Sequence, residues 1–411
     1  MDNLNCYYTA HLSPKDKSLK VQTHCSSELL SSTHHHEDQD LSIGRNWMES
    51  IEEYNGPSAY VVLRCDIIKI NGVNTSHKVW GQEYHLNRLE QSYRELVTCI
   101  STKNSSQDEE NIMKNTLVSF DERCLEVAHE ESKRIITALL EMVNKTYFQK
   151  NEQCSQGEDG DLQCEIMRLT LLWTPSADVQ NNKCALSLNV ISVRGHLSSS
   201  GQIMAPYQIP KSIVATLALP SPKEAPIATN QLPDRHVCPY AKISSWSKNR
   251  RSLEKKDSFM PEGVGEVLLL LNRNRNSTSS VGAYEILEGL TSNFFAIYRD
   301  GTIRTAQEGI LFGYVRHLVL QCALKCGLKV DNRPIHLGDG ANEEWIETFI
   351  TSSSRLIHPI RKILIPDYTK GINGEDRDER FNWKSFWTCK RVPQESSWYA
   401  ILREILKCNG Y

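Results

Sequence analysis

The stretch Tyr284-Glu-Ile-Leu-Glu-Gly-Leu-Thr-Ser-Asn-Phe-Phe-Ala-Ile297 decides the fold of this chain. Apolar residues on both sides of a turn of small residues predict two short strands, one around Glu288 and the other from Asn293 onward. Gly289 permits close approach of the backbone, and Asn293 is able to tie the turn to its neighbours. A hairpin with an exposed glutamate would show the same pattern, so this stretch alone leaves two interpretations open.

Two later segments follow the strand pair in an order that suggests one site. Gly309-Ile-Leu-Phe-Gly-Tyr-Val-Arg316 leads into an amphipathic helix predicted over 310–327, and a helix N-terminus binds phosphate through its amides and its dipole. Thr351-Ser-Ser-Ser-Arg355 follows a predicted strand at 347–350, and hydroxyls and amides at such a junction can cradle a phosphate. An ordinary helix start and an ordinary serine-rich loop would explain the same residues.

Two basic residues precede these segments. Arg88 lies in His85-Leu-Asn-Arg-Leu89, within a helix predicted over 84–100, and its planar charged fork suits a phosphate dianion. Lys242 lies in a loop, Cys238-Pro-Tyr-Ala-Lys-Ile-Ser-Ser-Trp246, and a Schiff-base lysine needs an amine that loses its proton easily. Among 47 Lys and Arg residues, neither carries a signal by itself.

Together, these motifs resemble the class IV pyridoxal-phosphate enzymes, a family that includes the D-amino-acid aminotransferases, the branched-chain aminotransferases and aminodeoxychorismate lyase. The resemblance covers roughly residues 55–365. It implies a fold-type IV architecture of the α/β (α+β) class, with a smaller N-terminal α/β domain and a larger C-terminal domain that has a barrel-like β core. Pyridoxal 5′-phosphate is the implied cofactor.

The resemblance also implies roles for individual residues. Lys242 would be the catalytic residue and would hold the cofactor as an internal aldimine, and Glu288 would keep the pyridine nitrogen protonated so that the ring acts as an electron sink. Leu311 would pack on the ring. The full set of implied cofactor-binding residues is Arg88, Lys242, Glu288, Ser292, Asn293, Leu311, Tyr314, Val315 and Ser353.

Phosphate would be anchored by Arg88, by Ser353 and by the amides of Tyr314 and Val315. The family usually has a threonine where this chain has Val315, so one hydroxyl contact to phosphate is missing. The spacing from Lys242 to Glu288 is also long, and the polar segment 272–282 would account for the excess as an insertion.

The implied activity is an aminotransferase that moves an amino group between an amino acid (D- or branched-chain) and a 2-oxo acid. An enzyme similar to aminodeoxychorismate lyase is an alternative. A cofactor-free scaffold or binding relative of the family is another, and Val315 is the observation in its favour. The family is usually dimeric, so the resemblance implies a homodimer.

Composition predicts the domain organisation. Residues 1–45 are polar and without periodicity, which predicts a disordered extension. Five prolines between Pro206 and Pro226 mark a crossover between a smaller domain at 46–205 and a larger, cofactor-binding domain at 206–411.

Bulk properties limit the function classes. The chain has 411 residues and a net charge of −3, which gives no electrostatic reason to expect nucleic acid as a partner. No apolar run reaches the ~20 residues of a membrane span. Thirteen scattered cysteines without a C-x-x-C pair, and no secretory signal, predict a cytoplasmic protein with reduced thiols and no metal site.

Overall fold

The structure is a computed structural model that describes residues 6–12, 19–25, 57–70, 73–103, 122–144, 162–175, 188–197, 210, 212–217, 240–250, 264–272, 284–366 and 383–411. The chain divides into two compact units. Unit 1 comprises Met1–Ala205 and Ala241–Lys248, and unit 2 comprises Pro206–Tyr240 and Asn249–Tyr411. The short segment that carries Lys242 therefore groups with unit 1, whereas the sequence analysis placed it in the second domain.

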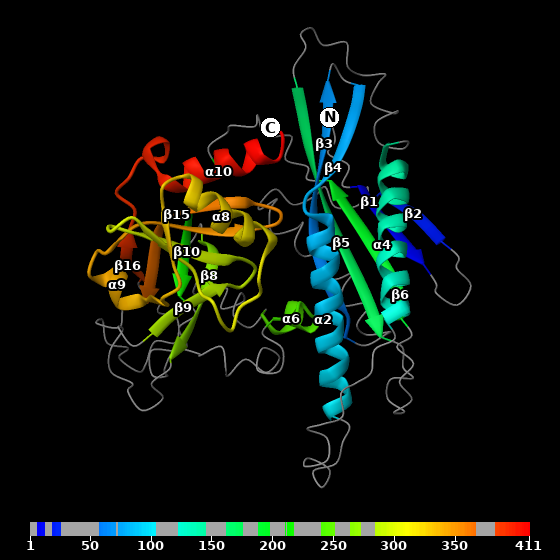
Figure 1. Cartoon of the computed structure of the whole chain (residues 1–411), viewed down its shortest axis with the longest axis horizontal. Coiled ribbons are helices and arrows are strands. Elements are labelled where there is room, and N and C mark those ends of the chain that lie inside the picture. Colours follow the sequence, from blue (N-terminus) through cyan, green and yellow to red (C-terminus); the bar gives the residue numbers. More distant parts are fainter. Residues whose placement is uncertain are drawn as a thin grey trace, which may run out of the picture. The chain divides into compact units, whose positions relative to one another are not determined.

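Unit 1 is a six-stranded sheet in the order β2-β1-β6-β5-β3-β4, and all neighbouring strands are antiparallel (Figure 1). Its strands are β1 (Cys6–Leu12), β2 (Leu19–Cys25), β3 (Ala59–Ile70), β4 (Val73–Val79), β5 (Leu162–Pro175) and β6 (Leu188–Leu197). Two long helices, α2 (Gln82–Lys103) and α4 (Glu122–Val143), pack on the sheet, and a short helix, α6 (Ser245–Asn249), follows Lys242.

Helix α2 packs on the sheet through one apolar stripe. Leu86, Leu89, Tyr93 and Leu96 recur at three- and four-residue steps and are all buried. The helix predicted over 84–100 is therefore confirmed. It begins slightly earlier than predicted, at Gln82, and ends slightly later, at Lys103.

The N-terminal region differs from the prediction. Within the expected extension over 1–45, residues 6–12 and 19–25 form β1 and β2, which pair with each other and join the sheet through β6. Leu19, Val21, Thr23 and Cys25 alternate with polar residues, which is a strand pattern of period two. The rest of that extension lies outside the described residues.

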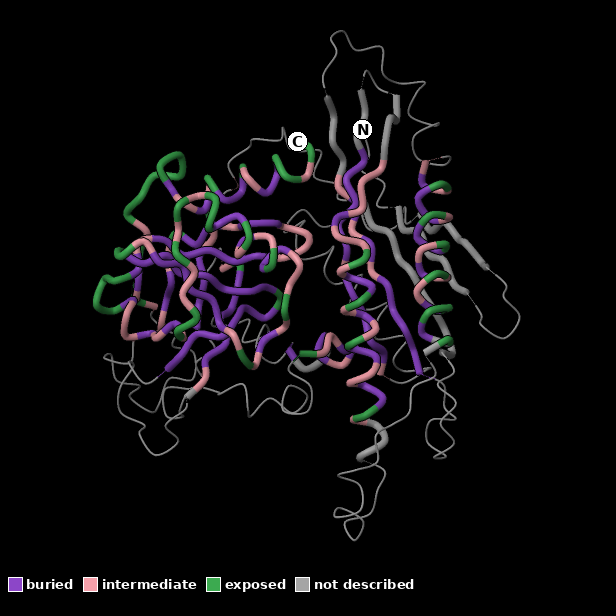
Figure 2. The backbone as a smooth tube through the Cα atoms, viewed as in Figure 1, coloured by how far each residue is buried: buried purple, intermediate pink, exposed green. Residues whose placement is uncertain are grey.

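Unit 2 is built on a closed six-stranded barrel. Going around it, β10 pairs with β14, β14 with β15, β15 with β7, β7 with β8, β8 with β9, and β9 again with β10. The barrel strands are β7 (Ile213–Leu217), β8 (Val264–Asn272), β9 (Tyr284–Gly289), β10 (Asn293–Tyr298), β14 (Trp345–Ser352) and β15 (Leu356–Pro366). The prediction of a barrel-like β core is thus confirmed, and Figure 2 shows that these strands are largely buried.

Further elements surround the barrel. The additional strands are β11 (Thr302–Arg304), β12 (Lys329–Asp331), β13 (Ile335–His336) and β16 (Trp383–Thr388). The helices are α8 (Tyr314–Lys325), α9 (Leu337–Ala341), a 3-10 turn at Pro393–Glu395 and α10 (Ser397–Cys408). Helices α8 and α10 pack on each other and on β14 (Figure 1). Within the described part of the chain, no helix is both long and apolar enough to cross a membrane.

Helix α8 begins later than predicted. The sequence favoured a start at Ile310, but the first helical residue is Tyr314, after an extended Gly313. The predicted glycine at the other end is confirmed, since Gly327 has φ +77 and directly follows the C-cap. The predicted insertion at 272–282 lies outside the described residues, apart from Asn272.

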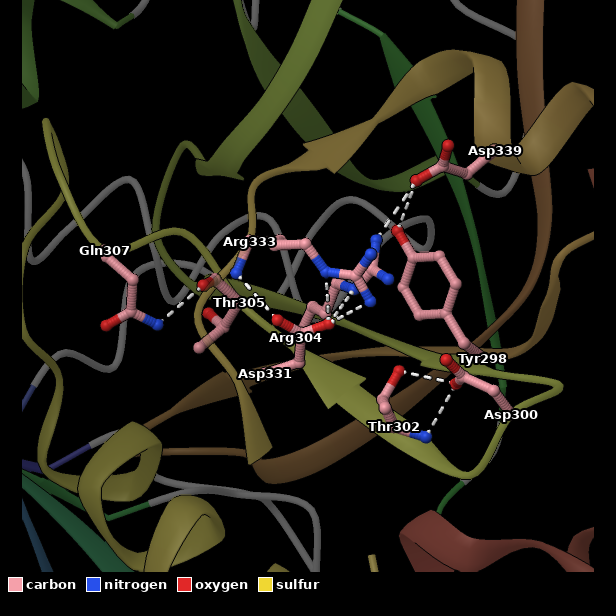
Figure 3. Close-up of polar contacts among 9 residues, drawn as sticks. All are labelled: Tyr298, Asp300, Thr302, Arg304, Thr305, Gln307, Asp331, Arg333 and Asp339. Carbon is pink, nitrogen blue, oxygen red and sulfur yellow. Dashed lines mark hydrogen bonds and ion pairs between the residues drawn. The ribbon is translucent and has the colours of Figure 1, made fainter. Parts of the chain in front are cut away.

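A polar cluster ties the small strands to the barrel (Figure 3). The Arg304 guanidinium lies 3.8 Å from the centre of the Tyr298 ring, and its Nε donates to Asp331 at 2.9 Å. Tyr298 in turn donates its hydroxyl proton to Asp339 at 2.7 Å. Burial and the bond to Asp339 raise the pKa of Tyr298, so the phenol stays a donor at neutral pH. The cluster therefore fixes β11, β12 and α9 around the end of β10.

Candidate active site

Three polar side chains lie in one row across neighbouring strands of unit 2. Glu288 on β9 is in register with Asn293 on β10, and Asn293 is in register with Thr351 on β14. All three are buried, and Glu288 is 2% exposed. An exposed hairpin glutamate, the alternative left open by the sequence, is therefore excluded.

Glu288 is held by two donors on the same carboxylate oxygen. Asn293 Nδ2 donates to Glu288 Oε2 at 3.2 Å, and Leu311 N donates to that oxygen at 3.3 Å. A carboxylate buried at this depth is stable only when hydrogen bonds replace its water shell.

Asn293 also fixes the loop that leads into α8. Its Nδ2 donates to Leu311 O at 2.7 Å, and its Oδ1 accepts a bond from Gly313 N at 3.2 Å. A Cβ placed on Gly313 would come within 2.4 Å of Asn293 Oδ1, so only glycine fits at this position. The loop 311–313 is therefore fastened to the strand pair at both of its ends.

The next segment supplies the start of α8. Tyr314 and Val315 are the first two helical residues, and the first amides of a helix have no partner within the helix. The Val315 side chain is buried at 2% exposure, so what this residue offers to an anion is its backbone amide. Burial raises the pKa of Tyr314, which keeps its phenol protonated.

The turn after β14 is organised by hydroxyl groups. Arg355 N donates to Ser352 Oγ at 3.2 Å, and Ser352 Oγ lies 3.4 Å from Ser354 Oγ. Ser353 stands between them and is half-buried. Arg355 Nη1 donates to Gly265 O at 3.3 Å, which ties this turn to the start of β8.

Ser292 has a contact that the sequence analysis did not foresee. Its hydroxyl donates to Glu266 Oε2 at 2.7 Å, in the turn between β9 and β10. The hydroxyl is thus directed to a carboxylate on β8 and not to Glu288, which accepts from Asn293 and from the amide of Leu311.

The remaining predicted residues lie in unit 1. Lys242 is half-buried, and its Nζ lies 5.0 Å from the centre of the Tyr60 ring. Its backbone is fastened on both sides, because Lys242 N donates to Ser92 Oγ at 3.0 Å and Tyr60 N donates to Lys242 O at 2.9 Å. The loop position of Lys242 is therefore set by strand β3 and helix α2.

Arg88 lies on the same face of α2 as His85 and Ser92, at three- and four-residue steps. Burial, with the charges of Arg88 and Lys242, holds the pKa of His85 well below its ordinary value, so this imidazole is neutral at pH 7. Arg88 Nη2 lies 3.0 Å from His85 Nδ1, and since arginine only donates, Nδ1 must be the acceptor. Burial lowers the pKa of Arg88 to about 10, which leaves it cationic at neutral pH.

The structure thus assembles the predicted residues in two groups. Unit 1 brings together Lys242 and Arg88, which both act on His85. Unit 2 brings together Glu288, Asn293 and Leu311.

Sequence reasoning missed Glu266, His85 and Ser92. Glu266 did leave a signal, because it is a charged residue at the start of the apolar run Val267-Leu-Leu-Leu-Leu271. The other two are polar residues on the apolar stripe of α2, where each also has a structural explanation.

Comparison with known proteins points to one family. The family model described as amino-transferase class IV matches residues 177–363. No curated protein matches the chain.

Solved structures show similarity at low identity. A branched-chain amino acid aminotransferase from Thermobaculum terrenum, in PLP form, is 14% identical over 98% of this chain and 93% of that chain, with a TM-score of 0.48. A hypothetical aminotransferase from Mycobacterium tuberculosis, with α-ketoglutarate and PMP bound, is 14% identical over 97% and 98%, with a TM-score of 0.46. The fold IV-transaminase CpuTA1 from Curtobacterium pusillum is 15% identical over 87% and 92%, with a TM-score of 0.43.

The family match covers Lys242, Glu288, Asn293 and Ser353, the residues on which the sequence analysis depended most. Residues 177–363, somewhat less than half of the chain, are therefore similar to the class IV aminotransferase family.

Proposed function

We propose that the chain is a pyridoxal-phosphate-dependent aminotransferase that moves an amino group between an amino acid and a 2-oxo acid. The observation that carries the proposal is the buried Glu288 carboxylate, held by Asn293 and by the amide of Leu311 inside a segment that matches the class IV family.

The residues of unit 2 fit such a cofactor. A buried carboxylate is the partner that a protonated pyridine nitrogen requires. Gly313 and Gly289 both lie where a Cβ would collide with neighbouring polar side chains, so the backbone on both sides of Glu288 is closely packed. The hydroxyl-rich turn at 352–354 and the amides at the start of α8 are suited to a phosphate dianion.

Each residue has a proposed task. Bound pyridoxal phosphate supplies an electron-withdrawing ring that stabilises negative charge at the substrate Cα. Lys242 would hold the cofactor, and its Nζ would serve as the base for the proton at the substrate Cα. Glu288 would accept a hydrogen bond from the ring nitrogen, and Leu311 would pack on the ring.

In this proposal, the phosphate is anchored by the residues that the family resemblance implies. Arg88 contributes a permanent positive charge and is oriented by neutral His85. Ser353 and the amides of Tyr314 and Val315 contribute neutral donors, and the amide of Val315 serves whether or not the side chain bears a hydroxyl. The departure at Val315 therefore costs one contact and leaves the helix N-terminus intact.

The substrate is either a D-amino acid or a branched-chain amino acid in this proposal, and the active form is a homodimer in the cytoplasm. Lyase chemistry on an aminodeoxychorismate-like substrate is the second candidate, because the family includes both reactions. Product analysis separates them, since a transaminase needs a 2-oxo acid as acceptor and a lyase does not.

The test is the visible absorption of the purified chain with added pyridoxal phosphate, before and after borohydride. The wild type should show a band that borohydride removes, and mass spectrometry should then find the cofactor attached to Lys242. Lys242→Ala should show no such band and no aminotransfer. Lys78→Ala is the matched control, because Lys78 also lies over an aromatic ring in unit 1, that of Trp80 at 6.0 Å, and it should behave as the wild type. A wild type without the band would favour the cofactor-free relative.

A further inference from the structure

Strands β9 and β10 are joined weakly by their own ladder. Although they follow each other in the chain, a single register pair links them, Asn293 with Glu288. The turn that connects them closes with one short backbone bond, from Gly289 N to Ser292 O at 2.7 Å. A single register pair does not by itself hold two side chains in fixed positions. Something outside the hairpin must therefore fix where Glu288 and Asn293 lie.

Glu266, at the start of β8, is placed to do this. Its side chain is buried at 6% exposure, and each of its two carboxylate oxygens accepts two bonds. Oε1 accepts from Leu290 N at 3.1 Å and from Val267 N at 3.2 Å. Oε2 accepts from Ser292 Oγ at 2.7 Å and from Thr291 Oγ1 at 3.1 Å. Every residue between Gly289 and Asn293 is thus bonded to this one carboxylate.

The packing around this carboxylate is close. A Cβ on Gly289 would lie 2.3 Å from Ser292 Oγ and 2.7 Å from Glu266 Cδ, so the turn folds directly onto the Glu266 side chain. The neighbouring residue on β8, Gly265, accepts a bond from Arg355 through its carbonyl oxygen. The start of β8 therefore contacts both the turn after Glu288 and the turn that carries Ser353.

We infer that Glu266 is a positioning residue, whose carboxylate sets the place of Glu288 and Asn293 and, through them, of the loop 311–313. The chain of contacts is continuous. Glu266 holds the turn, the turn fixes the one register pair of β9 and β10, and that pair binds Leu311 N and Gly313 N. The inference deepens the proposed function and rests on it only for the catalytic consequence, since the positioning itself is a property of the chain alone.

The first experiment needs no cofactor. Amide hydrogen exchange is measured on the full chain as wild type, Glu266→Ala and Glu266→Gln. Glu266→Ala should speed exchange at Leu311 and Gly313 by about tenfold or more, because the acceptors Glu288 and Asn293 lose their fixed positions. Glu266→Gln should restore much of the protection, since its oxygen still accepts from the amides and the hydroxyls of Thr291 and Ser292 can turn to accept from its NH₂.

A matched control separates positioning from general loss of stability. Glu347→Gln alters another buried carboxylate of the same unit, one that accepts from Ser397 N and Trp398 N at the start of α10. It should speed exchange at those two amides and leave Leu311 and Gly313 unchanged. If Glu266→Ala unfolds the chain, Thr291→Val removes one of the four bonds and should give a smaller change at the same two sites. Unchanged exchange at Leu311 and Gly313 in a folded Glu266 variant, with only 290–292 affected, would overturn the inference.

The second experiment tests the catalytic consequence by a double-mutant cycle in the cofactor-loaded enzyme. If Glu266 acts through Glu288, Glu266→Ala should lower kcat about tenfold in the wild type and have little further effect in a Glu288→Gln background. The position and pH dependence of the visible band should shift in the same direction in both single variants, whereas Glu347→Gln should leave the band in place. Independent, multiplicative effects of Glu266 and Glu288 would contradict the inference. A wild type without any band would refute the proposed function, and the exchange result would still decide the role of Glu266.

Discussion

Asn293 and Glu288 meet side chain to side chain at the single register pair of β9 and β10, with Asn293 Nδ2 donating to Glu288 Oε2 over 3.2 Å. The same asparagine accepts from Gly313 N and donates to Leu311 O, so one amide group connects the buried carboxylate with the approach to α8. Because both ends of this amide are used, neither a carboxylate nor a hydroxyl of similar size could replace it.

Replacing Asn293 should therefore weaken both the fold and the site. Asn293→Ala leaves a buried carboxylate and a buried amide short of partners, which costs on the order of 2 kcal/mol of unfolding free energy. Urea unfolding with and without pyridoxal phosphate measures both losses. Asn409→Ala removes an amide whose Nδ2 donates to Ile405 O at the end of α10, and it should leave cofactor affinity unchanged. Equal cofactor affinity in both variants would contradict the assigned role.

Gly313→Ala tests the closeness of the loop to Asn293. The backbone of Gly313 is in the extended region, with φ −75 and ψ 147, so alanine meets no conformational penalty and the whole effect is steric. Gly301→Ala is the opposite case, because Gly301 has φ +79 and open space around it. Both variants should lose about 1 kcal/mol or more of stability, but only Gly313→Ala should reduce cofactor affinity, as titration of the visible band would show.

The free energy of unfolding should decrease as the pH falls, and protonation of His358 should account for part of the decrease. Burial lowers the pKa of His358 from 6.5 to about 4, and the charge of Arg355 adds to this. The unfolded chain then binds more protons than the folded chain between these two values, so the stability from neutral His358 is complete above pH 6.5 and is lost as pH falls toward 4. The loss is on the order of 3 kcal/mol. Unfolding free energies of His358→Asn should fall less steeply over this range, and parallel curves would show that another group is responsible.

Glu347 on β14 should stabilise the N-terminus of α10 by direct hydrogen bonds, although the two are distant in sequence. Its carboxylate accepts from Ser397 N at 3.0 Å and Trp398 N at 3.2 Å, and Arg391 Nη1 donates to it at 3.0 Å. The helix has no side-chain cap of its own at Ser396, so Glu347 takes that role from β14. Glu347→Ala should cost about 1–3 kcal/mol, and far-ultraviolet circular dichroism should show loss of helix before the barrel unfolds. Glu395→Ala, an exposed carboxylate nearby, is the control and should be neutral.

Secondary structure was predictable from the sequence where a short, local pattern of residues determines it. Some features follow from sequence patterns within a few residues, and the structure confirms them. They are the two strands on either side of the Glu288 turn, the apolar stripe of α2, and the glycine at the C-terminus of α8, Gly327. The strand at 19–25 was missed because four alternating residues between polar neighbours are a weak signal, and its hydrogen bonds come from β1.

The roles in the site were less predictable, for a physical reason. Glu266 accepts hydrogen bonds from an amide and two hydroxyls of a turn about twenty-five residues further along the chain. No regular spacing in the sequence connects that turn to β8. Lys242 lies within the matched family segment, and its role there stays a prediction. Its grouping with unit 1 depends on two bonds of its own backbone, to the Tyr60 amide and to the Ser92 hydroxyl. Both cases depend on contacts between distant segments.

The position of β1 has a consequence for any shortened form of this protein. In the sheet of unit 1, β1 lies between β2 and β6 and pairs with residues 191–196 of β6. Removal of the first twenty-five residues would make β6 an edge strand and leave the N–H and C=O groups that face β1 unpaired. Such an edge recruits strands from other chains. Trimming the N-terminus should therefore make the protein prone to aggregation, because β1 and β2 protect the edge of the sheet.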